Sequence, residues 1–232
     1  VIDRTNGVLY FYPVGDNDDT PLTLLTGANT VLNIDNSCKH MVIRGLNFEN
    51  GKGGAINSCG YDISVQGCLF ESFTGAALSI EGELSGAAYN KIVNCGNSYT
   101  AASVTGGNRW SLTPARNYFQ NNIVFDDSDS GVAFAIISAV GCLVSHNLFA
   151  GAKSHLLSEG WCNEVIVENN SFAYGALVSA DAGAVYVCGT DFIGRGQHVR
   201  NNYFQDMSAY GNTKSTNAVY FDDFGQGKYA YN

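Results

Sequence analysis

A short motif recurs along most of this chain and restricts the folds that the chain can adopt. Each copy carries alternating β-branched residues, then a polar residue and Asn, and then an aromatic residue. Clear copies are Met41–Phe48, Ile63–Phe70, Leu143–Phe149, Val165–Phe172 and Gln197–Phe204, and weaker ones are Lys91–Cys95 and Phe119–Val124. Such repetition is the signature of a stacked architecture in which each repeat contacts only its neighbours.

The spacing of the copies varies, as expected for coils that keep their strands while one loop changes length. If residues 48, 70, 95, 124, 149, 172 and 204 are equivalent, the intervals are 22, 25, 29, 25, 23 and 32 residues. A second strand, marked by small residues, follows at Gly54–Ile56, Gly75–Leu78, Ala133–Ile136, His155–Leu157, Gly183–Tyr186 and Asn217–Tyr220. We therefore predict an all-β fold, a right-handed parallel β-helix (a solenoid) of about seven to nine coils. A two-sheet sandwich is the competing all-β fold.

The composition agrees with this prediction and excludes several classes of protein. Apolar residues make up 45% of the 232 residues and charged residues only 14%, while turns rely on 27 Gly rather than on the 3 Pro. The net charge of -9 with 12 Lys and Arg argues against a nucleic-acid partner. No apolar run reaches the ~20 residues that a membrane span needs. We expect residues 1–232 to form one β-helix domain of a longer, secreted, extracellular protein.

The cysteines fit the same repeat. Cys38 and Cys59 lie 10 and 11 residues before Phe48 and Phe70, which places them on successive coils. Strands ~4.8 Å apart bring two such residues within the Cα separation that a disulfide tolerates. A disulfide and a stack of buried free thiols remain the two interpretations.

Acidic residues gather beyond the second strand in the last coils. Counting four residues on from aligned positions of that strand reaches Glu81, Glu159, Cys188 and Asp222, and Asp191 and Asp223 follow close by. Carboxylates on adjacent coils would lie ~5 Å apart and those two coils apart ~10 Å, near the separations in retaining and inverting glycosidases. Solvated turn aspartates are the alternative interpretation.

Other side chains could contact a substrate or a metal ion. His155 opens a second strand close to Glu159, and Trp110, Tyr186 and Tyr220 are candidates for stacking on sugar rings. The acidic runs 16–19 and 126–129 could offer calcium its oxygen ligands, yet neither matches an EF-hand loop. We interpret both runs as solvated loops and expect no cofactor and no metal.

Several strings resemble large right-handed β-helix proteins related to β-helix glycoside hydrolases of the α-fucosidase/xylanase type, within the pectate-lyase-like superfamily. These strings are Thr5–Pro13, Gly106–Pro114, Asp181–Tyr186 with Asp191 and Arg195–Gly196, and Ala218–Asp223, and together they span nearly the whole chain in order. The resemblance implies that Asp181, Asp222 and Asp223 are catalytic candidates, with Asp191 beside them, and that Arg195 contacts substrate. The repeat register instead separates Asp181 from Asp222 by ~20 Å along the sheet, which favours Asp191 as the partner of Asp222.

Three functions follow from these residues. The first is a secreted glycoside hydrolase that uses paired Asp carboxylates on an extracellular polysaccharide or glycan. The second is a non-catalytic structural or adhesive β-helix, which would self-assemble or join neighbouring domains of the same chain. The third is a polysaccharide lyase, for which Arg195 and Lys228 are the closest basic residues.

Overall fold

The computed structural model describes residues 29–96, 100–125, 131–179, 181–189, 191–207, 216–223 and 227–232, and the backbone of two short strands before them. These two strands, β1 (Ile2–Asp3) and β2 (Val8–Leu9), pair antiparallel. All other strands of the described residues belong to three parallel sheets, and those residues form no helix.

Each sheet takes one strand from every coil. Sheet 1 contains β3 (Thr30–Ile34), β6 (Gly54–Ser58), β9 (Leu78–Ile80), β12 (Thr100–Val104), β15 (Val132–Ile137), β18 (His155–Gly160), β21 (Gly183–Cys188) and β24 (Asn217–Asp222). Sheet 2 contains β4 (Lys39–Arg44), β7 (Tyr61–Gln66), β10 (Gly86–Ala88), β13 (Tyr118–Gln120), β16 (Leu143–Ser145), β19 (Ile166–Glu168), β22 (Gln197–Arg200) and β25 (Lys228–Tyr231). Sheet 3 contains β5 (Asn47–Glu49), β8 (Leu69–Glu71), β11 (Lys91–Val93), β14 (Ile123–Phe125), β17 (Leu148–Ala150), β20 (Ser171–Ala173) and β23 (Tyr203–Gln205).

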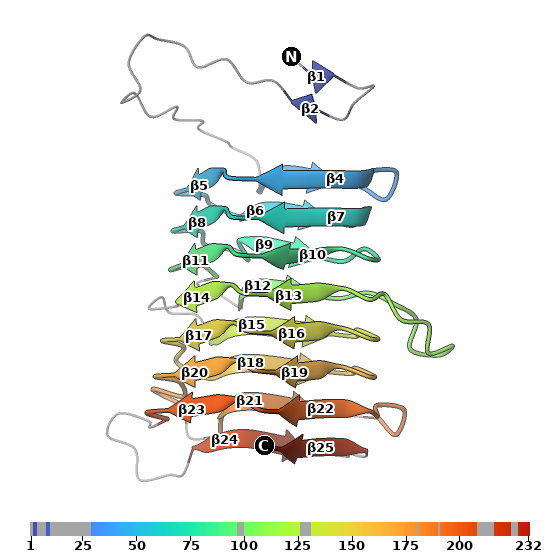
Figure 1. Cartoon of the computed structure of the whole chain (residues 1–232). Helices are drawn as coiled ribbons and strands as arrows, with labels where there is room; N and C mark the ends of the chain where they lie inside the picture. The colour runs from blue at the N-terminus through green and yellow to red at the C-terminus, as the bar shows by residue number, and fades with distance from the viewer. Residues whose placement is uncertain are drawn as a thin grey trace.

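The chain visits sheets 1, 2 and 3 in turn and then begins the next coil. Eight such coils are described, and the last one contributes strands to sheets 1 and 2 only. Figure 1 shows the coils stacked along one axis, from β4 and β5 at the top to β24 and β25 at the bottom. The protein is a right-handed parallel β-helix. The predicted fold is therefore confirmed, and the sandwich is wrong.

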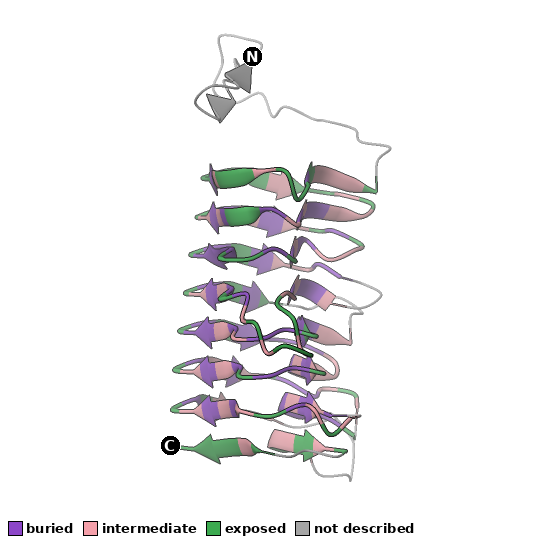
Figure 2. Ribbon diagram, turned by 90° about the vertical axis from the view of Figure 1, so that its right-hand side faces the viewer, coloured by how far each residue is buried: buried purple, intermediate pink, exposed green. Residues whose placement is uncertain are grey.

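Apolar side chains of sheet 3 form a column in the interior, and the ribbon of Figure 2 is purple along the buried segments of the coils. Stacked rings join Phe48 to Phe70 with centroids 5.1 Å apart, and Phe149 to Phe172 and Phe172 to Phe204 at 5.3 Å. The register places Ile92 and Val124 in the same column. The predicted equivalence of Cys95 was wrong, because Cys95 lies past the end of β11 and Ile92 takes the interior position.

A ladder of buried asparagines joins the coils at the turn from sheet 2 to sheet 3. Its members are Asn90, Asn122, Asn147, Asn170 and Asn202. In each step the side-chain carbonyl of one Asn accepts hydrogen bonds from the backbone N–H and the amide group of the Asn before it, as between Asn147 and Asn122 at 2.8 and 3.1 Å. The amide group also donates to a strand carbonyl, such as that of Phe119 at 2.8 Å. Backbone groups that the bend would leave unpaired are thereby satisfied.

The residue before each ladder position holds the bend. It adopts a left-handed conformation in every described coil that has this turn, with φ between 53° and 67° at Gly45, Gly67, Tyr89, Asn121, His146, Asn169 and Asn201. Gly and Asn tolerate this conformation best, which explains the Asn-Asn pairs of the repeat. Asn47 does not belong to the ladder, because it lies in β5 and is exposed.

Small residues occur near the start of the sheet 1 strands because these strands bend there. The carbonyl of Ala77 accepts hydrogen bonds from the N–H groups of both Ala55 and Ile56, as at a β-bulge. Two consecutive side chains then face the interior, as Ala133 and Phe134 do with no exposed surface. An alanine at the first of the two positions leaves room for the bend.

All seven cysteines lie among the described residues, and all are free thiols. Cys38 and Cys59 lie on successive coils, one position out of register, because Lys39 pairs with Tyr61. Cys59 instead donates to Glu81 at 3.4 Å.

We expect Asn147→Ala to lower the free energy of unfolding by at least about 2 kcal/mol, because the backbone N–H of Asn122 loses its acceptor, the Phe119 carbonyl loses a donor, and Asn170 loses one of its two donors. Urea unfolding measures this change. The matched control is Asn169→Gly, which keeps the left-handed turn and alters an exposed side chain. A loss for Asn147→Ala no larger than for the control would contradict the role assigned to the ladder.

Candidate functional site

The outer face of sheet 1 carries polar and aromatic side chains from the last three coils. In register across β18, β21 and β24, Ser158 pairs with Tyr186, which pairs with Tyr220, and Gly160 pairs with Cys188, which pairs with Asp222. Residues 28 and 34 positions apart in the sequence are thus brought side by side on one face.

Two tyrosines form the centre of this face. The rings of Tyr186 and Tyr220 meet edge to face with centroids 5.4 Å apart, and the ring of His155 stacks on Tyr186 at 4.1 Å. Gly183 has no side chain, and its N–H points to Nδ1 of His155 at 3.4 Å. The imidazole can therefore lie over the strand and against Tyr186.

Each tyrosine is joined to an acid of the other coil. The hydroxyl of Tyr186 donates to Oδ2 of Asp222 at 2.8 Å, and Oδ1 of Asp222 accepts the backbone N–H of Asp223 at 2.9 Å. A hydrogen bond to Asp181 raises the pKa of Tyr220, and burial with the bond to Asp222 raises the pKa of Tyr186. Both phenols therefore stay protonated and act as donors at neutral pH.

Asp181 and Asp222 each contact one member of the tyrosine pair, although the sequence register separates the two acids by ~20 Å along the sheet. Asp181 lies in a bend before β21 begins. Asp181 is exposed and Asp222 is half-buried, so both carboxylates can be reached from solvent. Asp223 is exposed beside them, and its carboxylate accepts a weak bond from Cys188 at 3.7 Å.

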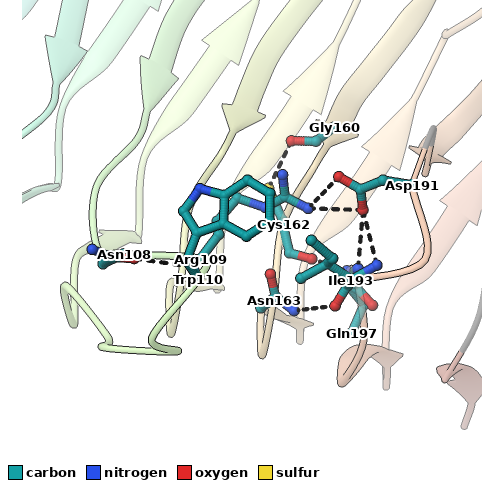
Figure 3. A network of polar contacts seen from close by, with 10 residues as sticks. Asn108, Arg109, Trp110, Gly160, Cys162, Asn163, Asp191, Ile193 and Gln197 are labelled. Carbon is teal, nitrogen blue, oxygen red and sulfur yellow. Dashed lines mark hydrogen bonds and ion pairs between the residues drawn. The ribbon is translucent and has the colours of Figure 1, made fainter.

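Asp191 belongs to a different cluster, in the turn from sheet 1 to sheet 2 (Figure 3). Both of its carboxylate oxygens lie 3.0 Å from one guanidinium nitrogen of Arg109, and Oδ1 also accepts the N–H groups of Ile193 and Gly194. Burial acts to raise the pKa of Asp191, but these bonds outweigh it and lower the pKa. The sequence contained no local sign of this pair, because 82 residues separate its members.

Glu159 lies in the core rather than on the acidic edge, and its predicted place on the substrate side is corrected. It pairs with Ile136 and Val187 in an interior column, is 1% exposed, and neither carboxyl oxygen has a hydrogen-bond partner. Burial raises its pKa to about 8, although the charge of Lys228 and the amide of Gln197 act in the opposite direction. The predicted register was one residue out, because His155 aligns with Gly183 and Leu156 takes the place that Ala184 takes in β21.

The other predicted residues lie outside this face. Trp110 is 83% exposed on the loop between β12 and β13, and Arg195 is exposed in the turn before β22. The amine of Lys228 donates to the Val187 carbonyl at 3.4 Å. The two candidate calcium runs, residues 16–19 and 126–129, fall outside the described residues, and so does most of the string 5–13. The described residues hold no cluster of three or more His, Cys, Asp or Glu side chains suited to a metal ion.

Comparisons with known proteins add one solved structure. No family model and no curated protein matches the chain. The receptor-binding domain of the siphovirus 9NA tailspike aligns with a TM-score of 0.45 and 10% sequence identity, over 87% of this chain and 45% of that one. The chain thus spans less than half the length of that structure. No described segment forms a helix long and apolar enough to cross a membrane.

We expect the stability of the protein to fall as the pH rises from about 4.5 to about 8 because of Glu159. Over this range the folded protein holds a proton that the unfolded chain has released, so the slope reaches ~1.4 kcal/mol per pH unit. Urea unfolding at several pH values measures it. Glu159→Gln should flatten the slope, whereas the exposed Glu164→Gln should leave it unchanged; equal slopes in all three proteins would contradict the assignment.

We also expect the imidazole of His155 to titrate below pH 6.5, because burial lowers its pKa more than the charge of Asp181 raises it. Ring resonances in an NMR titration report the midpoint. Asp181→Asn should lower the midpoint further, because the charge that favours the imidazolium is lost. A midpoint above 6.5 would show that His155 is not desolvated against Tyr186.

Proposed function

We propose that the outer face of sheet 1 binds a glycan at the tyrosine pair, and that the protein cleaves this glycan as a glycoside hydrolase. The observation that carries the proposal is the crossed arrangement, in which Tyr186 contacts Asp222 and Tyr220 contacts Asp181. Aromatic rings suit the apolar faces of sugars, and carboxylates accept hydrogen bonds from sugar hydroxyl groups. We place this reaction outside the cell.

Hydrolysis needs two carboxyl groups in different roles. One protonates the leaving oxygen, and the other attacks the sugar or activates a water molecule. We assign these roles to Asp181 and Asp222, which lie on the two sides of the tyrosine pair. Both oxygens of Asp222 accept hydrogen bonds, from Tyr186 and from the N–H of Asp223, so its orientation is fixed before a substrate arrives.

A non-catalytic adhesive protein is the second candidate function. It is favoured by the same hydrogen bonds, because both carboxylates already have phenol donors and the tyrosine rings are partly exposed. Such a face would hold a sugar without transferring a proton to it. The third candidate, a lyase, was expected to use a Lys or Arg base, but the Lys228 amine is directed to the backbone of β21 and Arg195 lies in the turn before β22.

The test is a glycan array followed by a hydrolysis assay on the glycans that bind. We expect Asp181→Asn and Asp222→Asn to lower the hydrolysis rate by at least about a hundredfold, because each removes one of the two proton-transfer or nucleophilic roles. Glu81→Gln is the matched control, since Glu81 occupies the same outer column of sheet 1 as Asp222, on an early coil.

The outcomes separate the two candidate functions. Hydrolysis that survives in both Asp variants would overturn the site assignment. Binding without hydrolysis by the unaltered protein, weakened in Tyr186→Phe and Asp222→Asn, would establish the adhesive function instead. Absence of binding to every glycan would overturn both.

A further inference from the structure

The loop between β12 and β13 lies along the edge where sheet 1 turns into sheet 2. Figures 1 and 2 show that it leaves the fourth coil and descends over the coils that follow. Asn108 and Thr113 form an antiparallel bridge in it, and Oδ1 of Asn108 accepts the N–H groups of Trp110 and Ser111 at 3.0 and 3.1 Å. The tip of the loop is thus a closed turn.

The ion pair of Arg109 and Asp191 fastens this tip to the seventh coil (Figure 3). The Arg109 side chain is only 14% exposed, and Asp191 is itself held by two backbone N–H groups. A guanidinium group that is desolvated in this way and bonded to both oxygens of a carboxylate holds its position well. Trp110 is therefore presented at a defined place.

Three exposed aromatic side chains lie in the turns and the loop at this edge, two of them next in sequence to a member of the ion pair. Trp110 follows Arg109 and is 83% exposed, Phe192 follows Asp191 and is 71% exposed, and Trp161 is 43% exposed in the turn after β18 in the sixth coil. Large aromatic side chains with much of their surface exposed are characteristic of a recognition surface.

We propose that Trp110, Trp161 and Phe192 form an aromatic subsite that stacks on sugar rings of a glycan chain. This inference rests on the proposed function and extends it, because it makes the ligand an oligosaccharide rather than a single sugar. Arg109 and Asp191 act as positioning residues in this subsite. A glycan fits better than a protein partner, because Trp110 and Phe192 each directly follow a charged residue, and sugars present apolar faces and hydroxyl groups side by side.

The subsite continues the face that carries the tyrosines. Trp161 directly follows Gly160, and Gly160 pairs with Cys188, which pairs with Asp222. Gly160 and Asp222 are therefore two strand spacings apart, which is about 10 Å along the helix axis. A glycan seated on Tyr186 and Tyr220 that extends toward the earlier coils therefore comes within reach of Trp161.

The chain's only two tryptophans, Trp110 and Trp161, both lie in this subsite, so tryptophan emission, excited selectively over the 13 tyrosines, reports on it alone. The probe is the glycan with the strongest array signal, titrated as oligomers of one to six units. We expect the emission to change and saturate with the longer oligomers and not with the monosaccharide. The Trp161→Phe variant leaves Trp110 as a single reporter.

Variants then assign the contacts. Trp110→Ala should weaken binding of the hexamer by about tenfold, equivalent to ~1.4 kcal/mol, and leave binding of the monosaccharide unchanged. Arg109→Gln should weaken hexamer binding while circular dichroism stays unchanged, because the loop loses its attachment. Ser111→Ala, at the same tip, is the matched control.

The outcomes distinguish this inference from the proposed function. Unchanged emission while the array binding persists would overturn the subsite and leave the tyrosine site intact. Fluorescence changes that survive in Tyr186→Phe with unaltered hexamer affinity would support the subsite and overturn the tyrosine site. Dimerisation that is lost in Trp110→Ala, measured by sedimentation, would show that the edge binds a second copy of the chain and would overturn the proposal.

Discussion

Hydrogen bonding from each coil to the next is the interaction on which this protein depends. A single coil encloses almost no apolar surface, so its strands gain a partner and a core only when another coil lies above or below. The asparagine ladder extends this bonding into a turn, where strand pairing has ended and where backbone groups would otherwise be buried without partners. The register of all three sheets is thereby fixed at the same place in successive coils.

A fixed register explains how distant segments build one face. Tyr186 and Asp222 meet because both follow the same bend in sheet 1, one coil apart. Because each coil repeats the same geometry, the outer columns can vary freely in sequence while the interior stays apolar. The outer positions that carry acids and aromatic rings therefore determine what such a protein can bind or convert. In this protein these residues are concentrated in β18, β21 and β24.

The sequence predicted most of the fold because the buried positions repeat. Phe149 and Phe172 obey one spacing rule, and so do Asn147 and Asn170, since the interior and the turn impose the same demand on every coil. Positions that depart from the rule were misplaced. Leu156 replaces the usual alanine at the bend, and this substitution shifted the predicted place of Glu159 by one residue, from the interior to the surface.

The candidate site was harder to predict than the core. Asp181, Asp222 and the two tyrosines could be named from the sequence, but their pairing depends on a bend outside the repeat. Arg109 gave no signal at all, because its partner lies 82 residues away and no periodic pattern links them. Contacts between loops of distant coils are set by side-chain reach, which the repeat does not encode.

The loop that carries Arg109 also affects how cooperatively the coils of the solenoid unfold. In a pure stack, each coil touches only its two neighbours, and the array can fray from one end coil by coil. The contact of Arg109 with Asp191 joins the fourth coil to the seventh and spans two others. Separation of the seventh coil from the stack therefore requires that the ion pair with Arg109, which belongs to the fourth coil, breaks first. The middle of the protein is thereby tied into one cooperative block, and it is this block that supports β18 and β21.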